Sequence, residues 1–382
     1  MSQRRSRLAR TVLVLPLAVG LAGTDLAGGG LHQTDLVSDQ AQVAKHQDAN
    51  LVNAWGLAFL PTSPFWIADN GTGKLTLYVS NGDAFPTQPS DPLVVTVPTP
   101  PGDEGPATPT GLVSNTGPGF VVSEDGHSAS SLFIAVTEDG TISGWSLTVD
   151  PLNAILMVDR SKQGAVYKGV ALATVKGDSF LYATDFHNGK VDMFDSSFQL
   201  LKSFTDPRIP ANFAPFDIAS VDGKLVVTFA KQALPDRHDD QAGPGNGIVD
   251  VFATDGTLLR RLVTGGALNS PWGLAVTPDG FPPFGHALLV GNFGDGRINA
   301  FDLRTGFPLG RLHDDSCNPI QIDGLWSLSF GNDFLAGEPD ILYFTAGPND
   351  ESHGLFGKLK VAPTKCDDGH DHGGSHGRMG GS

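Results

Sequence analysis

Short apolar runs alternate with turn-forming residues from about residue 33 to residue 362 of this chain. Six of the runs share one arrangement, in which an aromatic or polar residue leads into small and branched apolar residues. These six runs begin at Trp55, Thr110, Lys168, Phe216, Trp272 and Trp326, at intervals of 48 to 58 residues. A repeat of about 50 residues with four short strands is the sequence signature of a β-propeller. The pattern therefore predicts an all-β fold, a six-bladed β-propeller over residues 33–362.

Turn signals in the second half of the repeats support this register. Asp-Gly or Asn-Gly pairs at 139–140, 188–189 and 295–296 separate two β-rich runs. Such pairs favour tight hairpins because both residues tolerate a positive φ. No segment has a convincing amphipathic helical period, so helices are not expected in the ring.

The last repeat offers only three strands, at 326–330, 341–345 and 355–361. A propeller that did not join its first and last blades would expose two sheet edges. The segment 33–39 is strand-like and belongs to no repeat. We therefore expect this N-terminal strand to supply the outer strand of blade six and to close the ring.

The N-terminus predicts export. Four arginines precede an apolar run at 11–23 that is short for a transmembrane helix. This describes a signal peptide over residues 1–23, with cleavage between Ala22 and Gly30, and a secreted, periplasmic or cell-envelope protein. An uncleaved membrane anchor is the alternative. Otherwise we expect no transmembrane anchor in the mature chain.

Charge restricts the partners. Without residues 1–23 the chain has 21 basic and 41 acidic residues, a net charge of −20. Such a surface repels phosphate backbones, so nucleic acid is not an expected partner. A polar extracellular ligand or a cell-surface partner fits better. Disorder is disfavoured because 40% of the residues are apolar and the pattern is periodic.

The C-terminal region carries two further features. Cys317 and Cys366 are the two cysteines, and in an oxidising compartment they could form a disulfide or stay free. Residues 363–382 are rich in His, Asp and Gly, and His370, His372 and His376 could capture a divalent cation. A disordered, solvated tail is the alternative reading of this segment.

Several stretches carry a family resemblance. They include Asn50–Ala58, Pro61–Gly73, Gly243–Phe252, Leu268–Ala275 and Phe344–Asp350. With them, nearly the whole mature chain resembles an uncharacterised family of exported bacterial propellers, some with a PEP-CTERM sorting tail. The resemblance implies a six-bladed fold akin to NHL-repeat proteins and no established activity. This chain ends in the His-rich tail and has no apolar sorting helix, which puts a sorting role in doubt.

Polar residues at strand ends are expected to share one face of the disc, near the central channel. Asp69, Asp185 and Asn292 end second strands, and Asp217 is the one obvious acid on an inner strand. The other candidates precede inner strands: Asn53, Asn212, Asn269 and Asp323. Carboxylate and amide oxygens suit Ca²⁺ or a sugar. The alternative is that Asp and Asn only stabilise their own turns.

The loop from Lys231 to Gly247 interrupts the fourth repeat and should overhang the same face. Within it, His238 or Asp239 could move a proton and Arg237 could grip a carboxylate, although a charged loop is often merely solvated. The blade-six turn at 349–353 could contribute across the channel. The aromatic residues that begin the repeats are expected to pack between blades.

Two functions follow from these features. The favoured one is a binding or scaffold protein that presents one face of the disc to a polar ligand. The alternative is a metal-dependent hydrolase or lyase, similar to gluconolactonase or amidating-lyase propellers. In that case a divalent ion such as Ca²⁺ or Zn²⁺ would be held by some of Asp69, Asp185, Asn269 and Asn292. Motifs for nucleophilic serine catalysis, nucleotide binding and HExxH metalloproteases are absent from the sequence.

Overall fold

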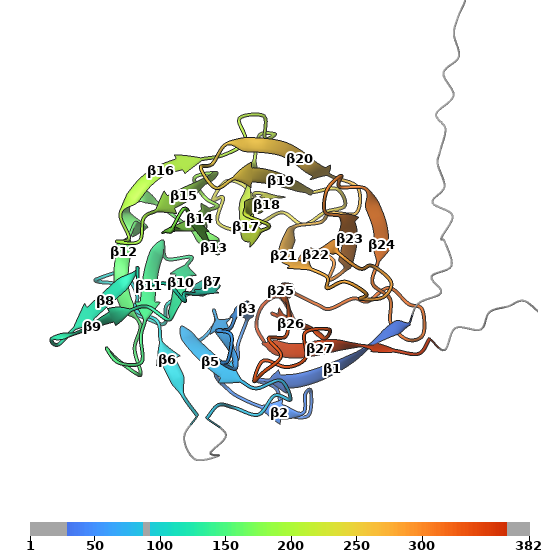
Figure 1. The fold of residues 1–382 in the computed structure, drawn as a ribbon, viewed down its shortest axis with the longest axis horizontal. Helices are drawn as coiled ribbons and strands as arrows, with labels where there is room; N and C mark the ends of the chain where they lie inside the picture. The colour runs from blue at the N-terminus through green and yellow to red at the C-terminus, as the bar shows by residue number, and fades with distance from the viewer. Residues whose placement is uncertain (1–28, 87–91, 365–382) are drawn as a thin grey trace, which may run out of the picture.

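Six small antiparallel sheets stand in a ring around a central channel in the computed structural model of the protein (Figure 1). The structure describes residues 29–86 and 92–364. Within these ranges the one helical element is a single 3-10 turn, η1 (Ser161–Gln163). The predicted all-β, six-bladed propeller is confirmed.

Blades one to three follow one another around the ring, each with four strands in its main sheet and the first strand innermost. Blade one holds β3 (Ala54–Ala58), β4 (Phe65–Asp69), β5 (Lys74–Tyr78) and β6 (Val94–Thr96). Blade two holds β7 (Pro109–Ser114), β10 (Phe133–Thr137), β11 (Thr141–Trp145) and β12 (Ile155–Asp159). Blade three holds β13 (Tyr167–Val175), β14 (Asp178–Asp185), β15 (Lys190–Phe194) and β16 (Leu200–Phe204).

Blades four to six complete the ring. Blade four holds β17 (Phe213–Val221), β18 (Lys224–Lys231), β19 (Gly247–Ala253) and β20 (Leu258–Thr264). Blade five holds β21 (Pro271–Val276), β22 (Ala287–Asn292), β23 (Ile298–Asp302) and β24 (Pro308–Arg311). Blade six holds β25 (Leu325–Phe330), β26 (Leu342–Ala346) and β27 (Leu355–Ala362), and its remaining strands come from the N-terminal side of the chain.

The ring is closed by β1 (Gly30–Ser38), which pairs antiparallel with β27 from Gly30–Ala362 to Ser38–Leu355. The predicted closing strand is therefore confirmed. Leu36 and Val37 of β1 are fully buried in the core between blades six and one. A short parallel strand, β2 (His46–Gln47), follows on the outer side of β1.

One hairpin was not predicted. It consists of β8 (Val121–Glu124) and β9 (His127–Ser130), inserted between the first two strands of blade two. Asp125 and Gly126 form its turn, both with positive φ. The pair is an ordinary Asp-Gly hairpin signal.

The aromatic residues that begin the repeats meet at the centre of the ring. Trp55 and Trp326 stack with ring centroids 3.4 Å apart, and Trp272 lies edge-on to both at 5.8 Å. Blades one and five are not neighbours, so the Trp55–Trp272 contact crosses the channel. Phe216 packs in the same cluster. These rings therefore fill the channel rather than the seams between blades, and they divide it into two ends.

Candidate functional site

A cluster of ionisable and amide side chains covers the aromatic rings at the end of the channel where the inner strands begin, here called the top face. The members are Asn53, Asn70, Glu138, Lys168, His238, Asp239 and Glu351. We call them the mouth cluster. They come from loops and strand starts of blades one, two, three, four and six.

Lys168 lies at the centre of the mouth cluster, in β13, where blades one, five and six have tryptophan. Only 3% of its side chain is exposed. The ammonium forms an ion pair with Glu138 and lies 3.7 Å from Asp239 Oδ1 and 5.2 Å from the centre of the Trp55 ring. Burial lowers the pKa of Lys168, but the charges of Glu138 and Asp239 outweigh burial and raise it, so the ammonium persists at neutral pH.

A chain of amides and carboxylates links Lys168 to blades one and six. The Asn70 amide donates to Glu138 Oε2 at 2.8 Å, and the Asn53 amide donates to Asn70 at 3.1 Å and to Glu351 Oε2 at 2.7 Å. The indole of Trp326 donates to Asn53 Oδ1 at 3.0 Å. Asn53 has a φ of 49°, which asparagine tolerates better than most residues. The polar network is thereby fixed to the aromatic layer beneath it.

The blade-four loop, between Lys231 and Gly247, brings His238 and Asp239 to the same place. His238 Nδ1 lies 2.8 Å from Asp239 Oδ1 and 3.9 Å from Glu138 Oε1. The side chains of His238 and Asp239 are 45% and 74% exposed, whereas Glu138 is 12% exposed. His238 and Asp239 are therefore the accessible edge of a largely buried cluster.

Two further groups of the cluster have raised pKa values. Burial raises the pKa of Glu351 to about 7; the Asn53 hydrogen bond lowers it, and the Glu138 charge adds to the rise. The hydrogen bond to Asp239 raises the pKa of His238 above its usual 6.5. The same bond lowers the pKa of Asp239. A proton donor and a proton acceptor can thus coexist here at neutral pH.

The strand-end residues expected to bind a ligand lie beside this cluster and form hydrogen bonds within the protein. Asp69 accepts from Thr76 at 2.7 Å, and Asp185 accepts from the Asn188 amide at 2.8 Å. Asn292 Oδ1 accepts from the Asn269 backbone at 3.1 Å, and Asn269 Oδ1 accepts from the Gly243 backbone. The side chains of Asp69, Asp185 and Asn292 are fully buried. The Asp185–Asn188 contact lies within one turn, as the turn-stabilising alternative expects, whereas Asp69 bonds to the next strand and Asn292 and Asn269 bond to other loops.

The residue that follows the end of the second strand lies toward the mouth in each of blades one to five. These residues are Asn70, Glu138, Phe186, Gln232 and Phe293. Asn70 and Glu138 belong to the mouth cluster, and Phe293 stacks on Trp326 at 4.0 Å. At the end of a strand, consecutive side chains point to opposite sides. This alternation places the expected residues in the turn and the next residues over the channel.

Other predicted residues are dispersed. Asn212 precedes β17 with its backbone carbonyl bonded to Gln232, and Asp323 accepts from the Asn349 backbone at 2.9 Å. Arg237 is exposed on the blade-four loop. Asp217 lies in the channel on the other side of the aromatic rings from the mouth cluster.

The C-terminal predictions fall largely beyond the described residues. Cys317 is not a free thiol, and its predicted partner Cys366 lies outside the residues that the structure describes. The tail residues His370, His372 and His376 lie outside them as well.

Two features of the sequence could have identified members of the mouth cluster that the sequence analysis did not predict. Lys168 is a charged residue at a repeat position that is otherwise apolar, aromatic or threonine. Glu138 stands in the Thr137–Gly140 turn, which copies the turn that holds Asn70 in blade one. Glu351 belongs to the blade-six turn that was expected to contribute across the channel, and it does contact Asn53.

Glu138, His238 and Asp239 could also approach a metal ion, since one ligand atom from each lies within 4.8 Å of the others. However, the ammonium of Lys168 already contacts the Glu138 oxygen of this trio and lies 3.7 Å from the Asp239 oxygen. A divalent ion among these oxygens would be repelled by that buried charge. The trio alone is therefore a poor cage for a metal.

Comparison with known proteins gives relatives and a fold. No family model matches the chain. The chain is 32% identical to uncharacterized protein L690 of Acanthamoeba polyphaga mimivirus over 336 residues, which cover 85% of this chain and 84% of L690. It is 33% identical to uncharacterized protein R648 of the same virus over 335 residues, or 85% of this chain and 78% of R648. The resemblance to an exported bacterial family stays a prediction.

Two solved structures share the architecture. A glucose dehydrogenase superposes with a TM-score of 0.51 at 14% identity and covers 87% of this chain and 100% of its own. The GH93 α-L-arabinofuranosidase of Fusarium graminearum, in complex with arabinobiose, superposes with a TM-score of 0.50 at 10% identity and covers 87% of this chain and 98% of its own. At these identities the likeness shows the propeller fold alone.

Proposed function

The chain belongs to the family that includes the mimivirus proteins L690 and R648, and we propose that it binds a polar ligand at the mouth of the channel on the top face. One observation carries the proposal. Side chains from four other blades gather around the buried Lys168, while His238 and Asp239 remain accessible above it. A structural ion pair would need neither the exposed edge nor so many contributing blades.

The chemistry of the cluster indicates the kind of ligand. Glu138, Asp239 and Glu351 offer carboxylate oxygens, and the positive charges nearby are those of Lys168 and protonated His238. The excess of acceptors favours a ligand rich in hydroxyl or amide donors, such as a glycan or a peptide, and disfavours an anion.

Ligand-induced stabilisation tests this proposal. A glycan and peptide panel is screened by thermal unfolding, and hits are titrated into wild type and His238→Ala/Asp239→Asn. We expect neutral, donor-rich members to stabilise the wild type and the double variant to lose most of the shift. Asp236→Asn, an exposed acid on the same loop, is the matched control. Equal binding by wild type and double variant would place the ligand elsewhere.

A second candidate, a hydrolase or lyase, is favoured by one observation. The pKa of Glu351 is raised to about 7, so its protonated and ionised forms are both present at neutral pH, and the pKa of the neighbouring His238 is raised as well. Lactone and ester hydrolysis would then follow a bell-shaped pH profile that Glu351→Gln alters on one limb. Turnover that needs Ca²⁺ or Zn²⁺ and is abolished by EDTA would support the metal-dependent form. Turnover unchanged in both Glu351→Gln and His238→Ala would refute this candidate.

Export is proposed from the sequence of residues 1–23, which lie outside the described residues. Among the described residues no helix is long and apolar enough to cross a membrane. Sequencing the N-terminus of the protein recovered from expressing cells tests the proposal. A mature start between residues 23 and 31 is expected, and an intact Met1 in the membrane fraction would indicate an anchor instead.

A further inference from the structure

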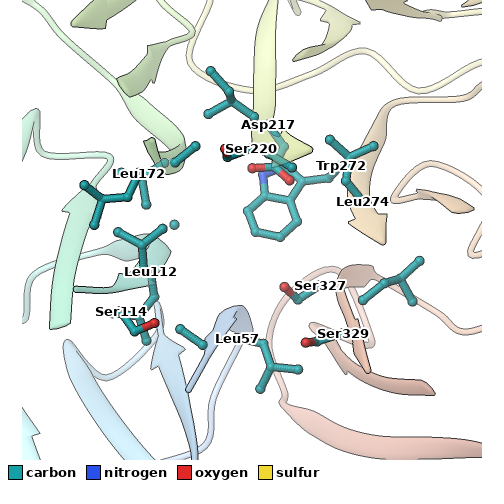
Figure 2. Close-up of a pocket in the computed structure, with 18 of the residues that line it drawn as sticks. Leu57, Leu112, Ser114, Leu172, Asp217, Ser220, Trp272, Leu274, Ser327 and Ser329 are labelled. Carbon is teal, nitrogen blue, oxygen red and sulfur yellow. The ribbon is translucent and has the colours of Figure 1, made fainter. Parts of the chain in front are cut away.

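The opposite end of the channel holds a separate cavity of about 380 Å³. Its walls are the middle and final parts of the inner strands, below the aromatic rings. Five leucines and four serines are among its lining residues; Leu57, Leu112, Leu172, Leu274, Ser114 and Ser327 are labelled in Figure 2. Among the lining residues Asp217 is the one ionisable group. We call this space the lower cavity.

Asp217 occupies a position where other blades have glycine. The equivalent residues in blades one, two, three and five are Gly56, Gly111, Gly169 and Gly273. A Cβ on Gly56 would lie 2.4 Å from the Thr110 carbonyl oxygen, because inner strands of adjacent blades approach closely here. The fold therefore has no need for a carboxyl group at this position, and its presence in blade four requires another reason.

The carboxyl group of Asp217 has little to bond with inside the protein. The residue is 8% exposed, and the one group acting on its carboxyl oxygens among the described residues is the backbone N–H of Ile218. Burial raises the pKa of Asp217 well above its usual range. Trp272 Nε1, which also borders this space, is buried without a hydrogen-bond partner among the described residues. Figure 2 shows Asp217 and Trp272 on the same side of the cavity.

We propose that the lower cavity binds a small organic amine, with its ammonium group against Asp217 and its apolar body against the leucines. The volume accommodates a ligand of this size, since small-molecule pockets begin at about 300 Å³. The serine hydroxyls can accept the remaining ammonium protons. The charge is complementary, and no other charged residue borders the space. Lys168, on the adjacent strand β13, is engaged with Glu138 above Trp55 and does not compensate Asp217.

Proton linkage gives the proposal a pH dependence. The ammonium pairs with the ionised carboxylate, so an Asp217 that is protonated when the cavity is empty must release its proton on binding. Affinity should therefore rise with pH, by up to about tenfold per unit while the pH is below the raised pKa of Asp217. A neutral isostere of the same shape should show no such dependence.

Isopentylamine and isopentyl alcohol are the matched probes, titrated into the mature protein by NMR at pH 6 and pH 8. We expect the amine to bind more tightly at pH 8, and Asp217→Asn to weaken it at least tenfold while leaving alcohol binding unchanged. Asp217→Gly, which introduces the residue found at this position in four other blades, should weaken amine binding to the same extent. Agreement between the two variants would show that the loss does not come from misfolding of Asp217→Asn. Asp323→Asn, on the top face, is the control and should retain full affinity.

Three results would overturn the proposal. They are undetectable amine binding to the wild type at pH 8, equal affinity in Asp217→Asn, and equal affinity for the amine and the alcohol. The last result would describe an apolar cavity without cation recognition. Because His238→Ala/Asp239→Asn affects only the mouth cluster, amine binding should survive in that variant, which separates this proposal from the proposed function.

Discussion

Replacing Lys168 by methionine tests whether the buried ammonium organises the mouth cluster. Methionine keeps most of the apolar stem and removes the charge. Glu138, 12% exposed, would then lose its cation and keep the Asn70 hydrogen bond of 2.8 Å. We expect the remaining carboxylate, rather than lost packing, to dominate the change in the free energy of unfolding.

The magnitude follows from the burial of the pair. Removing one partner of a buried ion pair typically costs about 3–5 kcal/mol. The Asn70 bond and the partial exposure of Glu138 place the loss near the lower bound, and the missing cation–π contact with Trp55, at 5.2 Å, adds about 0.5–1 kcal/mol. The expected total is about 3–4 kcal/mol, a large part of the stability of an ordinary domain.

Urea unfolding at pH 7 measures this loss, with Lys224→Met, at an exposed position of β18, as the control that should change stability by less than about 0.5 kcal/mol. Adding Glu138→Gln to Lys168→Met should restore at least half of the loss, since no buried charge is then left unpaired. A loss below about 1 kcal/mol, or a double variant no more stable than Lys168→Met, would refute the reasoning.

Three further predictions concern the fold and its titration. Burial raises the pKa of Glu351 from 4.5 to about 7, so the carboxyl group ionises more readily in the unfolded chain than in the folded protein. As the pH rises from 4.5 to 7, the free energy of unfolding of the wild type should therefore fall by about 2–3 kcal/mol relative to that of Glu351→Gln. Parallel pH–stability curves for the two proteins would contradict this. Gly56→Ala should cost about 1–3 kcal/mol, measured by urea unfolding, because the added Cβ lies 2.4 Å from the Thr110 carbonyl oxygen. Gly117→Ala, whose added Cβ would meet only side-chain atoms at 3.3 Å or more, is the control for crowding. Leu36→Ala should cost about 3–5 kcal/mol by the same assay, because Leu36 is 1% exposed, and a change under about 1 kcal/mol would mean that β1 does not close the ring.

The fold could be predicted from the sequence because the same pattern of strands and turns recurs about every 50 residues. Each blade needs an apolar inner strand and a tight turn, so six copies of Trp55-Gly56-Leu57 or its variants fix the number of blades. The closing strand followed from counting strands in the last repeat. The hairpin Val121–Ser130 was missed because it lies outside the repeat and has few apolar residues.

The mouth cluster could be predicted only in part. The blade-four loop was expected over the top face because it interrupts the repeat, and its His238 and Asp239 do lie there. The strand-end residues predicted to face the channel were each one residue too early in the sequence. In blade one, for example, Asp69 bonds to its own blade, whereas Asn70 faces the channel. Lys168 could not be recognised from the repeat. The apolar pattern shows which position begins each inner strand, but it does not show that a charged residue at that position lies in a binding site.

The pairing of β1 with β27 also sets the order of events during biosynthesis. Gly30 is among the first described residues to leave the ribosome, and its partner Ala362 is among the last. Until then the nascent chain carries five blades and an unpaired strand with the buried side chains Leu31, Leu36 and Val37 exposed to water. Non-local pairing of this kind is slow and invites association with other chains. Any C-terminal truncation before residue 355 should leave an open ring, however much of each blade has formed.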